Sequence, residues 1–167
     1  EQLSSVIGGN EITEDETFFD TISNIEEINA PNGSTLDSRG STESVVINLF
    51  NGLFSTKFNN KPIGSIIKGF TNAIGTRFND FLRGDSQNNI LLGLSGNDIL
   101  QGGKGDDEII GGKGNDQVKG GKGNDTIHLS GEIDDYTFTK IGSKIRVIDH
   151  RESPENDGID FIDSVEF

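Results

Sequence analysis

The sequence has no cysteine, no methionine and no tryptophan, and each absence narrows what the chain can be. Without cysteine there is neither a disulfide framework nor a thiolate metal site. Without methionine the chain does not include its own start, which indicates a piece of a larger protein. Hydrophobic residues make up only 31%, and no apolar run reaches membrane-spanning length. No N-terminal signal peptide is recognisable either.

Positive charge is also scarce. Lys and Arg number 14 against 28 Asp and Glu, so the net charge is −14. This balance excludes nucleic acid and anionic membrane as partners, because both require a basic face. Low hydrophobicity with high like charge usually predicts disorder. Here the acidic residues are regularly spaced, which predicts instead a fold that a cation completes.

Glycine is abundant, with 23 residues, and most of it follows a nine-residue period from residue 75 to residue 128. Position one is glycine in six successive units: Gly75, Gly84, Gly93, Gly102, Gly111 and Gly120. Position six carries Asp80, Asn89, Asp98, Asp107, Asp116 and Asp125. Position eight is always aliphatic, as Leu82, Leu91, Leu100, Ile109, Val118 and Ile127. Three kinds of position that keep phase over six units are a strong repeat signal.

The period predicts the backbone path. Glycine at positions one, two and four permits positive φ, and Asn or Asp at position five tolerates the same region. The first six residues are therefore expected to form a tight turn, and positions seven to nine a three-residue strand. Two units bring the chain back over itself, so strands 18 residues apart stack in parallel, roughly 4.8 Å apart. The predicted fold is all-β, a right-handed parallel β-solenoid with 18 residues per coil and two aliphatic inner walls.

Acidic turns are expected to stack along both edges of this solenoid. One edge would carry Asp80, Asp98 and Asp116, and the other Asn89, Asp107 and Asp125. Carboxylates stacked at sheet spacing repel one another unless a cation lies between the turns. Calcium suits such a site better than magnesium, because it accepts six to eight oxygen ligands in flexible geometry. The alternative is a glycine-rich solenoid whose aspartates only cap turns.

The units GGKGDDEII, GGKGNDQVK and GGKGNDTIH resemble the RTX nonapeptide G-G-x-G-x-D-x-U-x. The match is strict from about Gly93 to His128 and looser from Gly75 to Leu92. The resemblance implies a parallel β-roll that holds Ca²⁺ between adjacent turns. By position it implies ligands at Asp98, Asp107, Asp116 and Asp125 and at the loop carbonyls around Gly96, Gly103, Gly105, Gly112, Gly114, Gly121 and Gly123. The expected ligand set also includes Asp80, which matches at position six, the in-phase Asp134, and the position-one glycines Gly102, Gly111 and Gly120.

The array weakens at both ends. In the first two units Arg77 and Phe78 replace the residues expected at positions three and four, Gln87 replaces a glycine, and Asn89 replaces the aspartate, so these turns are expected to bind weakly or not at all. The most complete sites are expected in the strict repeats, between the turns of Asp98 and Asp116 and between those of Asp107 and Asp125. Beyond Asp116 the next in-phase acid is Asp134, which is expected to close the last site, with its neighbour Asp135 an equal candidate.

The chain divides into four predicted parts. Residues 1–60 are irregular N-terminal solenoid coils, 61–92 degenerate rungs, 93–128 the strict repeats and 129–167 a capping segment. In the first part VVINL has strand composition, residues 19–28 allow an amphipathic helix as an alternative, and the acidic cluster at residues 11–16 is a solvated face. In the last part YTFTKIGSKIRVIDH alternates around Gly142 and Ser143, which predicts a β-hairpin, and IDFIDSVEF predicts a final strand. This segment is expected to cover the open end of the roll.

No catalytic motif is present: HExxH, G-x-S-x-G and a Cys–His pair are all missing, and His128 and His150 are expected at the surface. The chain is therefore expected to be non-enzymatic and monomeric. We expect a secreted or cell-surface module that folds on extracellular calcium, and the resemblance implies type I export. One alternative is an adhesion module whose Lys104, Lys113 and Lys122 bind a polysaccharide. Another is the non-catalytic C-terminal domain of a secreted enzyme, such as a serralysin-type metalloprotease, which would contact other domains of the same polypeptide.

Overall fold

The structure is a computed structural model that describes residues 27–58, 61–152 and 156–163. In these residues the chain forms strands and one 3-10 helix, η1. The elements are β1 (Glu27–Asp37), β2 (Val46–Asn48), β3 (Leu53–Phe58), β4 (Lys61–Ile74), β5 (Phe81–Arg83), β6 (Ile90–Ser95), β7 (Ile99–Lys104), β8 (Glu108–Lys113), β9 (Gln117–Lys122), β10 (Thr126–His128), η1 (Ile133–Asp135), β11 (Tyr136–Ile141), β12 (Lys144–Asp149) and β13 (Ile159–Asp163). The acidic cluster at residues 11–16 and most of the alternative helix lie outside the described residues.

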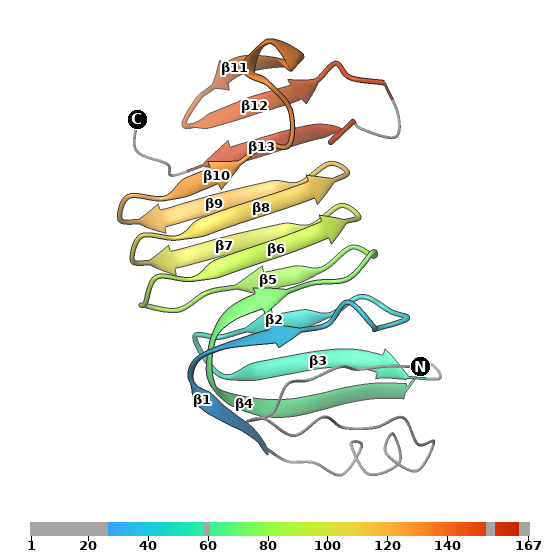
Figure 1. Cartoon of the computed structure of the whole chain (residues 1–167), viewed down its shortest axis with the longest axis vertical. Coiled ribbons are helices and arrows are strands. Elements are labelled where there is room, and N and C mark those ends of the chain that lie inside the picture. The colour runs from blue at the N-terminus through green and yellow to red at the C-terminus, as the bar shows by residue number, and fades with distance from the viewer. Residues whose placement is uncertain (1–26, 59–60, 153–155, 164–167) are drawn as a thin grey trace.

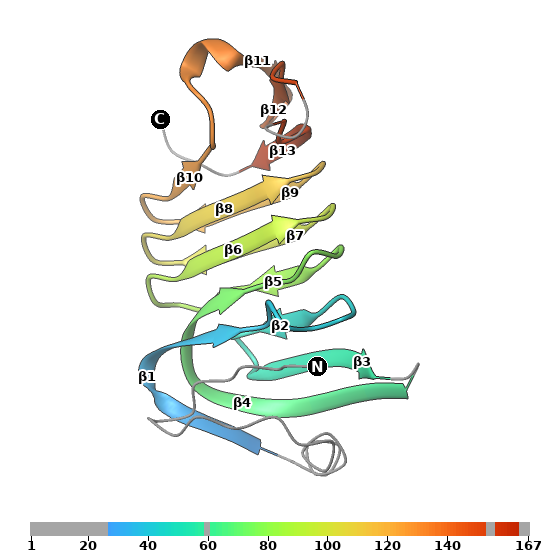
Figure 2. The same cartoon turned by 45° about the vertical axis from the view of Figure 1, so that its right-hand side comes forward.

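The strands form two parallel ladders that run along the long axis of the molecule (Figures 1 and 2). One ladder contains β4, β6, β8 and β10, and the other β2, β5, β7 and β9. Paired residues in the repeats are 18 apart, as in Leu82 opposite Leu100 and Leu91 opposite Ile109. Strand β3 joins the ladders, because it pairs antiparallel with both β2 and β4. The prediction of an all-β fold, a parallel β-roll with 18 residues per coil, is confirmed.

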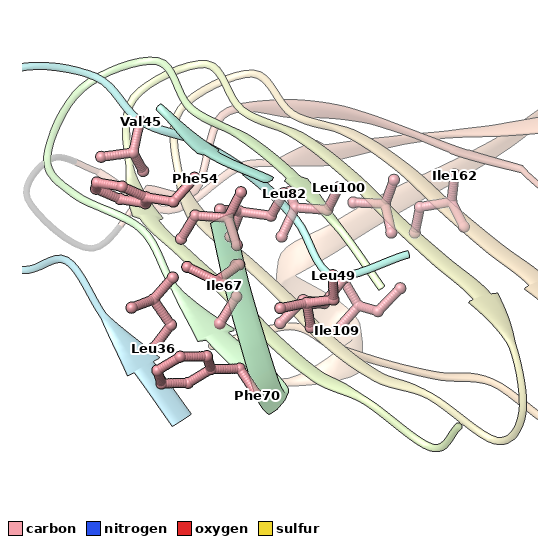
Figure 3. Close-up of a cluster of buried hydrophobic side chains, with 14 of the residues drawn as sticks. Leu36, Val45, Leu49, Phe54, Ile67, Phe70, Leu82, Leu100, Ile109 and Ile162 are labelled. Atoms are coloured by element: carbon pink, nitrogen blue, oxygen red, sulfur yellow. The ribbon is translucent and has the colours of Figure 1, made fainter. Parts of the chain in front are cut away.

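Two columns of aliphatic side chains fill the roll. The first contains Ile47, Leu82, Leu100, Val118 and Ile162, and the second Ala73, Leu91, Ile109 and Ile127. Each repeat contributes a single inward residue, so this part of the core is narrow. It widens toward the N-terminal end, where Leu36, Leu49, Phe54, Ile67 and Phe70 are also buried (Figure 3).

The strands of the repeats are longer than expected. β6 to β9 have six residues each and include the first three positions of the next unit, as the pairing of Gly103 with Gly121 shows. The turn is therefore confined to positions four to six, and the expected six-residue turn is wrong. The expected positive φ at position five is also wrong, because Leu94, at position two, is the only described non-glycine residue with positive φ.

Position five has another role. Its Asn or Asp side chain links one coil to the next, since the Asn97 Oδ1 accepts a hydrogen bond from the Asn115 backbone N–H at 2.8 Å. The bonds from Asn97 to Asn79 and from Asn124 to Asp106 repeat this geometry at the same spacing. The Asn and Asp preference at position five therefore reflects a ladder of side-chain acceptors rather than a left-handed backbone.

The described N-terminal residues are regular strands rather than the irregular coils we expected. β1 pairs parallel with β4, and Ile28 of the alternative helix lies in β1. β2 contains Val46 and Ile47 of the VVINL segment, so that strand is confirmed. No nine-residue period marks these strands. The parallel partners of β1 and β2 lie more than 18 residues away, as in Glu27 opposite Ile66 and Val46 opposite Phe81, and β3 pairs antiparallel with its neighbours in the chain.

The cap is a hairpin followed by a returning strand. β11 and β12 pair antiparallel around Gly142 and Ser143, with Ile141 opposite Lys144, as predicted. β13 then pairs antiparallel with β12 and parallel with β9. It covers the last strand of one ladder, and Figure 2 shows the cap at the end of the stack.

Candidate metal centre

The aspartates at position six form two hydrogen-bonded columns. In the first, Asp98 Oδ1 accepts a bond from the Asp80 N–H, and Asp116 Oδ1 accepts one from the Asp98 N–H, both at 2.8 Å. In the second, Asp107 Oδ1 accepts from the Asn89 N–H at 2.8 Å, and Asp125 Oδ1 from the Asp107 N–H at 3.1 Å. The two edges predicted from the 18-residue spacing are therefore present.

The second oxygen of these carboxylates has a different environment. The Oδ2 atoms of Asp98, Asp107 and Asp116 are buried and have no hydrogen-bond partner among the described residues. Each lies above the position-one glycine of its own unit, so that a Cβ on Gly93, Gly102 or Gly111 would overlap it. Position one is glycine because this oxygen takes the space that a side chain would fill.

Burial disfavours the ionised form of these carboxylates. It is the main cause that raises the pKa of Asp98 to about 7, and repulsion from Asp116 and Asp80 adds to it. Burial likewise raises the pKa of Asp107 to about 6, and repulsion from Asp125 adds to it. Burial also raises the pKa of Asp116 to about 6. A positive charge between the turns would return these groups to the ionised state.

The glycines at positions two and four bring successive turns close together. The seven residues with φ between 100° and 127° are Gly96, Gly103, Gly105, Gly112, Gly114, Gly121 and Gly123. At Gly114 a Cβ would overlap the carbonyl oxygen of Gly96 one coil below. The other predicted glycines, Gly102, Gly111 and Gly120, lie at position one and do not have positive φ.

At the N-terminal end of both columns, the position-six side chains are satisfied by hydrogen bonds within the protein. Asp80 Oδ1 accepts a bond from the Val45 N–H at 2.8 Å, and its Oδ2 accepts one from the Thr76 N–H at 2.6 Å. The Asn89 amide donates to the Thr71 carbonyl at 2.7 Å, where a carboxylate has no hydrogen to offer. Both residues are thus satisfied within the protein, although Asp80 was a predicted ligand.

The C-terminal end differs from the prediction. Asp134 lies exposed in η1 and does not continue the Asp116 column, and Asp135 instead accepts a bond from the Glu132 N–H at 2.8 Å. The chain leaves the coil path after β10, so the 18-residue phase no longer places residues. Asp160 of β13 takes the position, because its Oδ1 accepts a bond from the Asp116 N–H at 2.9 Å.

Asp160 was missed although a signal is present. Residues 157–162 read DGIDFI, which matches positions three to eight of the repeat, x-G-x-D-x-U. The glycine that opens each repeat unit is absent there, and the number of residues between Asp116 and Asp160 is not a multiple of nine.

The donor set suits a hard cation shared between turns. In the described part of the chain no three Asp, Glu or His side chains converge on one point. An ion between successive turns would therefore be held by carboxylates from the turns above and below together with backbone carbonyls. All of these ligands are oxygens, as calcium requires, and the unpartnered Oδ2 atoms of Asp98, Asp107 and Asp116 fit it.

Stacked acidic turns on a parallel coil define a calcium-binding β-roll. Residues 69–100 and 92–127 match the family described as RTX calcium-binding nonapeptide repeat (4 copies). Residues 69–127 of the chain therefore consist of RTX calcium-binding nonapeptide repeats, and the expected resemblance is confirmed. A comparison with curated proteins found no match. None of the helices in the described residues could cross a membrane.

Proposed function

We propose that this β-roll is a calcium-responsive folding module of a secreted protein. The observation that carries the proposal is the pair of columns in which Asp98, Asp107 and Asp116 bury one carboxylate oxygen without a partner among the described residues. A buried, unpaired carboxylate is costly, so a folded roll at neutral pH needs a compensating charge.

The two carboxylate oxygens of each position-six aspartate have different roles. Oδ1 ties each coil to its predecessor through a backbone N–H, and Oδ2 is left for an ion shared with loop carbonyls. Bound Ca²⁺ would supply the positive charge that lets these carboxylates stay ionised. The single inward side chain of each unit contributes about 2 kcal/mol by burial, so the repeats have little other stabilisation.

The proposed location is extracellular. Extracellular calcium modules bind at ~10⁻⁴–10⁻³ M, a range that leaves the sites unfilled in a calcium-poor cytosol. A site at about 100 times its Kd adds about 2.7 kcal/mol to folding, and several sites act together. The family resemblance supports secretion by a type I pathway, with the other domains of the same polypeptide as partners.

The proposed role is binding rather than catalysis. His128 and His150 are both exposed: the His128 Nε2 lies 3.8 Å from Glu108 Oε2, and the His150 Nε2 lies 2.7 Å from the Thr137 Oγ1, as expected of surface residues. A polysaccharide-binding lysine row has less support. Lys104 pairs with Lys122 on one ladder, but Lys113 lies on β8 of the other, opposite Ser95.

Far-ultraviolet circular dichroism with EGTA and with calcium tests the proposal. The β signal should be weak in EGTA, return with calcium, and fail to return with magnesium at the same concentration. Asp98→Asn and Asp107→Asn should each raise the calcium midpoint, and Asp134→Asn, which changes an exposed carboxylate outside the columns, should leave it unaltered. A spectrum that is the same in EGTA and in calcium would overturn the folding role.

A further inference from the structure

Strand β13 reproduces the bonding of a regular coil although it is far from the array in sequence. The Gly114 N–H donates to the Asp157 carbonyl at 2.9 Å, and the Phe161 N–H donates to the Asp116 carbonyl at 2.9 Å. One coil earlier, the Gly96 N–H donates to the Lys113 carbonyl and the Gln117 N–H to the Asp98 carbonyl, both also at 2.9 Å.

The side-chain bonds are equivalent as well. The Ile159 N–H donates to Asn115 Oδ1 at 2.8 Å, as the Asn115 N–H does to Asn97. Gly158 has φ of 95°, and a Cβ there would overlap the Gly114 carbonyl oxygen. Residues 157–162 are therefore one more turn and strand of the roll, supplied by the cap.

The joint between this turn and the array is acidic and not fully packed. Asp116 is fully buried, and its Oδ2 lies above Gly111 without a partner among the described residues. A cavity of about 10 Å³ is lined by Gly111, Gly112, Asp157 and Asp160, by His128, and by the apolar side chains of Val118, Ile127, Leu129 and Ile162. A cavity of this size holds about one water molecule.

The neighbouring carboxylates at this joint are not equally free. Asp157 is engaged by Arg151 at 3.0 Å, by the Ser130 hydroxyl at 2.5 Å and by the Tyr136 hydroxyl at 3.1 Å. Asp160 receives the Asp116 N–H on Oδ1, and it is 7% exposed. The carboxylates that face each other across the joint without a cationic partner in the described residues are Asp116 and Asp160.

We propose that this joint is a further calcium site, held by Asp116 from the array and Asp160 from the cap. The inference rests on the proposed function, since it extends the same column by one turn. Calcium at this position fastens the cap to the roll, so the segment between β10 and β13 docks only when the ion is bound. The column then ends on a residue that lies outside the matched repeats.

The only tyrosine in the chain makes this site observable by itself. Tyr136 lies in the cap with its hydroxyl against Asp157, and the sequence has no tryptophan. Terbium replaces calcium at oxygen sites and emits when a nearby tyrosine absorbs the exciting light. Wild-type protein titrated with Tb³⁺ should show tyrosine-sensitised emission that added calcium removes. An absence of this emission, in protein that equilibrium dialysis shows to bind calcium, would overturn the inference alone.

Variants assign the signal. Asp160→Asn keeps the bond to the Asp116 N–H and removes the charge, so the emission midpoint should rise at least about tenfold, because ligand charge sets affinity. Asp107→Asn, on the opposite edge, should lower the calcium count but keep the emission, and Asp134→Asn should change neither. An unchanged midpoint in Asp160→Asn would overturn the site. If dialysis detects no calcium on the wild-type chain, the proposed function fails as a whole.

Discussion

At the scale of the residue, position six shows how a single substitution starts or ends a column. Asp98 leaves one oxygen without a donor among the described residues, whereas Asn89 uses its amide nitrogen to satisfy the Thr71 carbonyl. Its own Oδ1 accepts a bond from the Asp85 N–H at 2.8 Å. The Asn89 amide therefore satisfies its polar neighbour with a hydrogen bond, whereas the aspartates of the next turns would need a bound ion.

We predict that Asn89→Asp makes the first coil depend on calcium. The carboxylate would face the Thr71 carbonyl and the Asp85 side chain without a hydrogen to donate, which costs about 1–3 kcal/mol in the calcium-free chain. Thermal melts in EGTA and in calcium measure the effect, and the difference between the two Tm values should widen. Asn88→Asp is the matched control, because Asn88 is an exposed acceptor for the Asp106 N–H. Equal behaviour of the two variants would contradict the role given to Asn89.

The buried carboxylates also predict how stability depends on pH. Burial raises the pKa of Asp98 from 3.8 to about 7, so between these values the folded chain binds a proton that the unfolded chain has released. Without calcium, the contribution of Asp98 to stability is therefore fully present below about pH 4 and is lost as pH rises through about 7. With calcium the dependence should reverse, because protons compete with the ion for the same oxygens. Urea unfolding at a series of pH values tests this, and parallel curves in EGTA and in calcium would contradict it.

At the scale of the element, Gly93, Gly102 and Gly111, which each begin a unit, lie inside a strand and beneath a carboxylate oxygen. A Cβ on Gly102 would lie 2.6 Å from the Gly120 carbonyl oxygen and would overlap Asp107 Oδ2. We predict that Gly102→Ala costs about 1–3 kcal/mol by overpacking and weakens calcium binding at Asp107. Calorimetric calcium titration and thermal melts measure both effects. Gly64→Ala is the control, since its Cβ meets only the Phe54 carbonyl oxygen, at 3.6 Å, and a similar loss there would contradict the argument.

The cap has its own polar anchor. The Arg151 Nη2 contacts Asp149 at 2.7 Å and Asp157 at 3.0 Å, and it holds the pKa of Asp149 at about 2. Both carboxylates are buried, so removal of the guanidinium leaves two buried charges without their cation.

We predict that Arg151→Ala lowers the Tm by several degrees in calcium, where the cap is docked, because it leaves the buried carboxylates of Asp149 and Asp157 without their cation. The control is Arg39→Ala. Arg39 contacts Asp37, two residues before it in the chain, just as Arg151 contacts Asp149, but Arg39 is exposed. The control should melt like the wild type. Equal Tm values for the two variants would show that burial of the Arg151 partners contributes nothing.

The repeat period predicts most of the roll because inward residues, turn glycines and acidic turns share one spacing. The columns of Leu82 and Leu91 and the two acidic edges follow from it directly. Where pairing ignores the period, prediction fails. Strand β1 pairs parallel with β4, and β3 pairs antiparallel with β2, at spacings unrelated to the repeat. Strand β13 reaches the roll only after the β11–β12 hairpin, so Asp160 takes the place expected for the in-phase Asp134. The number of residues between β10 and β13 depends on how the β11–β12 hairpin packs, and the repeat spacing carries no information about that packing.

At the scale of the whole molecule, stabilisation is divided between two ends of one sheet. The N-terminal end buries Leu36, Leu49, Phe54, Ile67 and Phe70 around β3 and β4 (Figure 3). The repeats bury one aliphatic residue per unit and depend on charged turns. A solenoid has stability terms that act mainly between neighbouring coils, so its ends need not unfold together.

We predict that calcium removal unfolds the molecule unevenly. In EGTA, amide hydrogen exchange should become fast in β6 to β10 and in β13, because these strands border the unpartnered carboxylates of the described columns. Strands β3 and β4 should keep slow exchange, since burial of their large side chains does not involve the columns. Asp160→Asn, measured in calcium, should release β13 and the β11–β12 hairpin while β7 stays protected, and Asp134→Asn should match the wild type. Uniform exchange along the whole chain in EGTA would mean instead that the N-terminal core has no stability of its own, and that the ion columns hold the entire sheet.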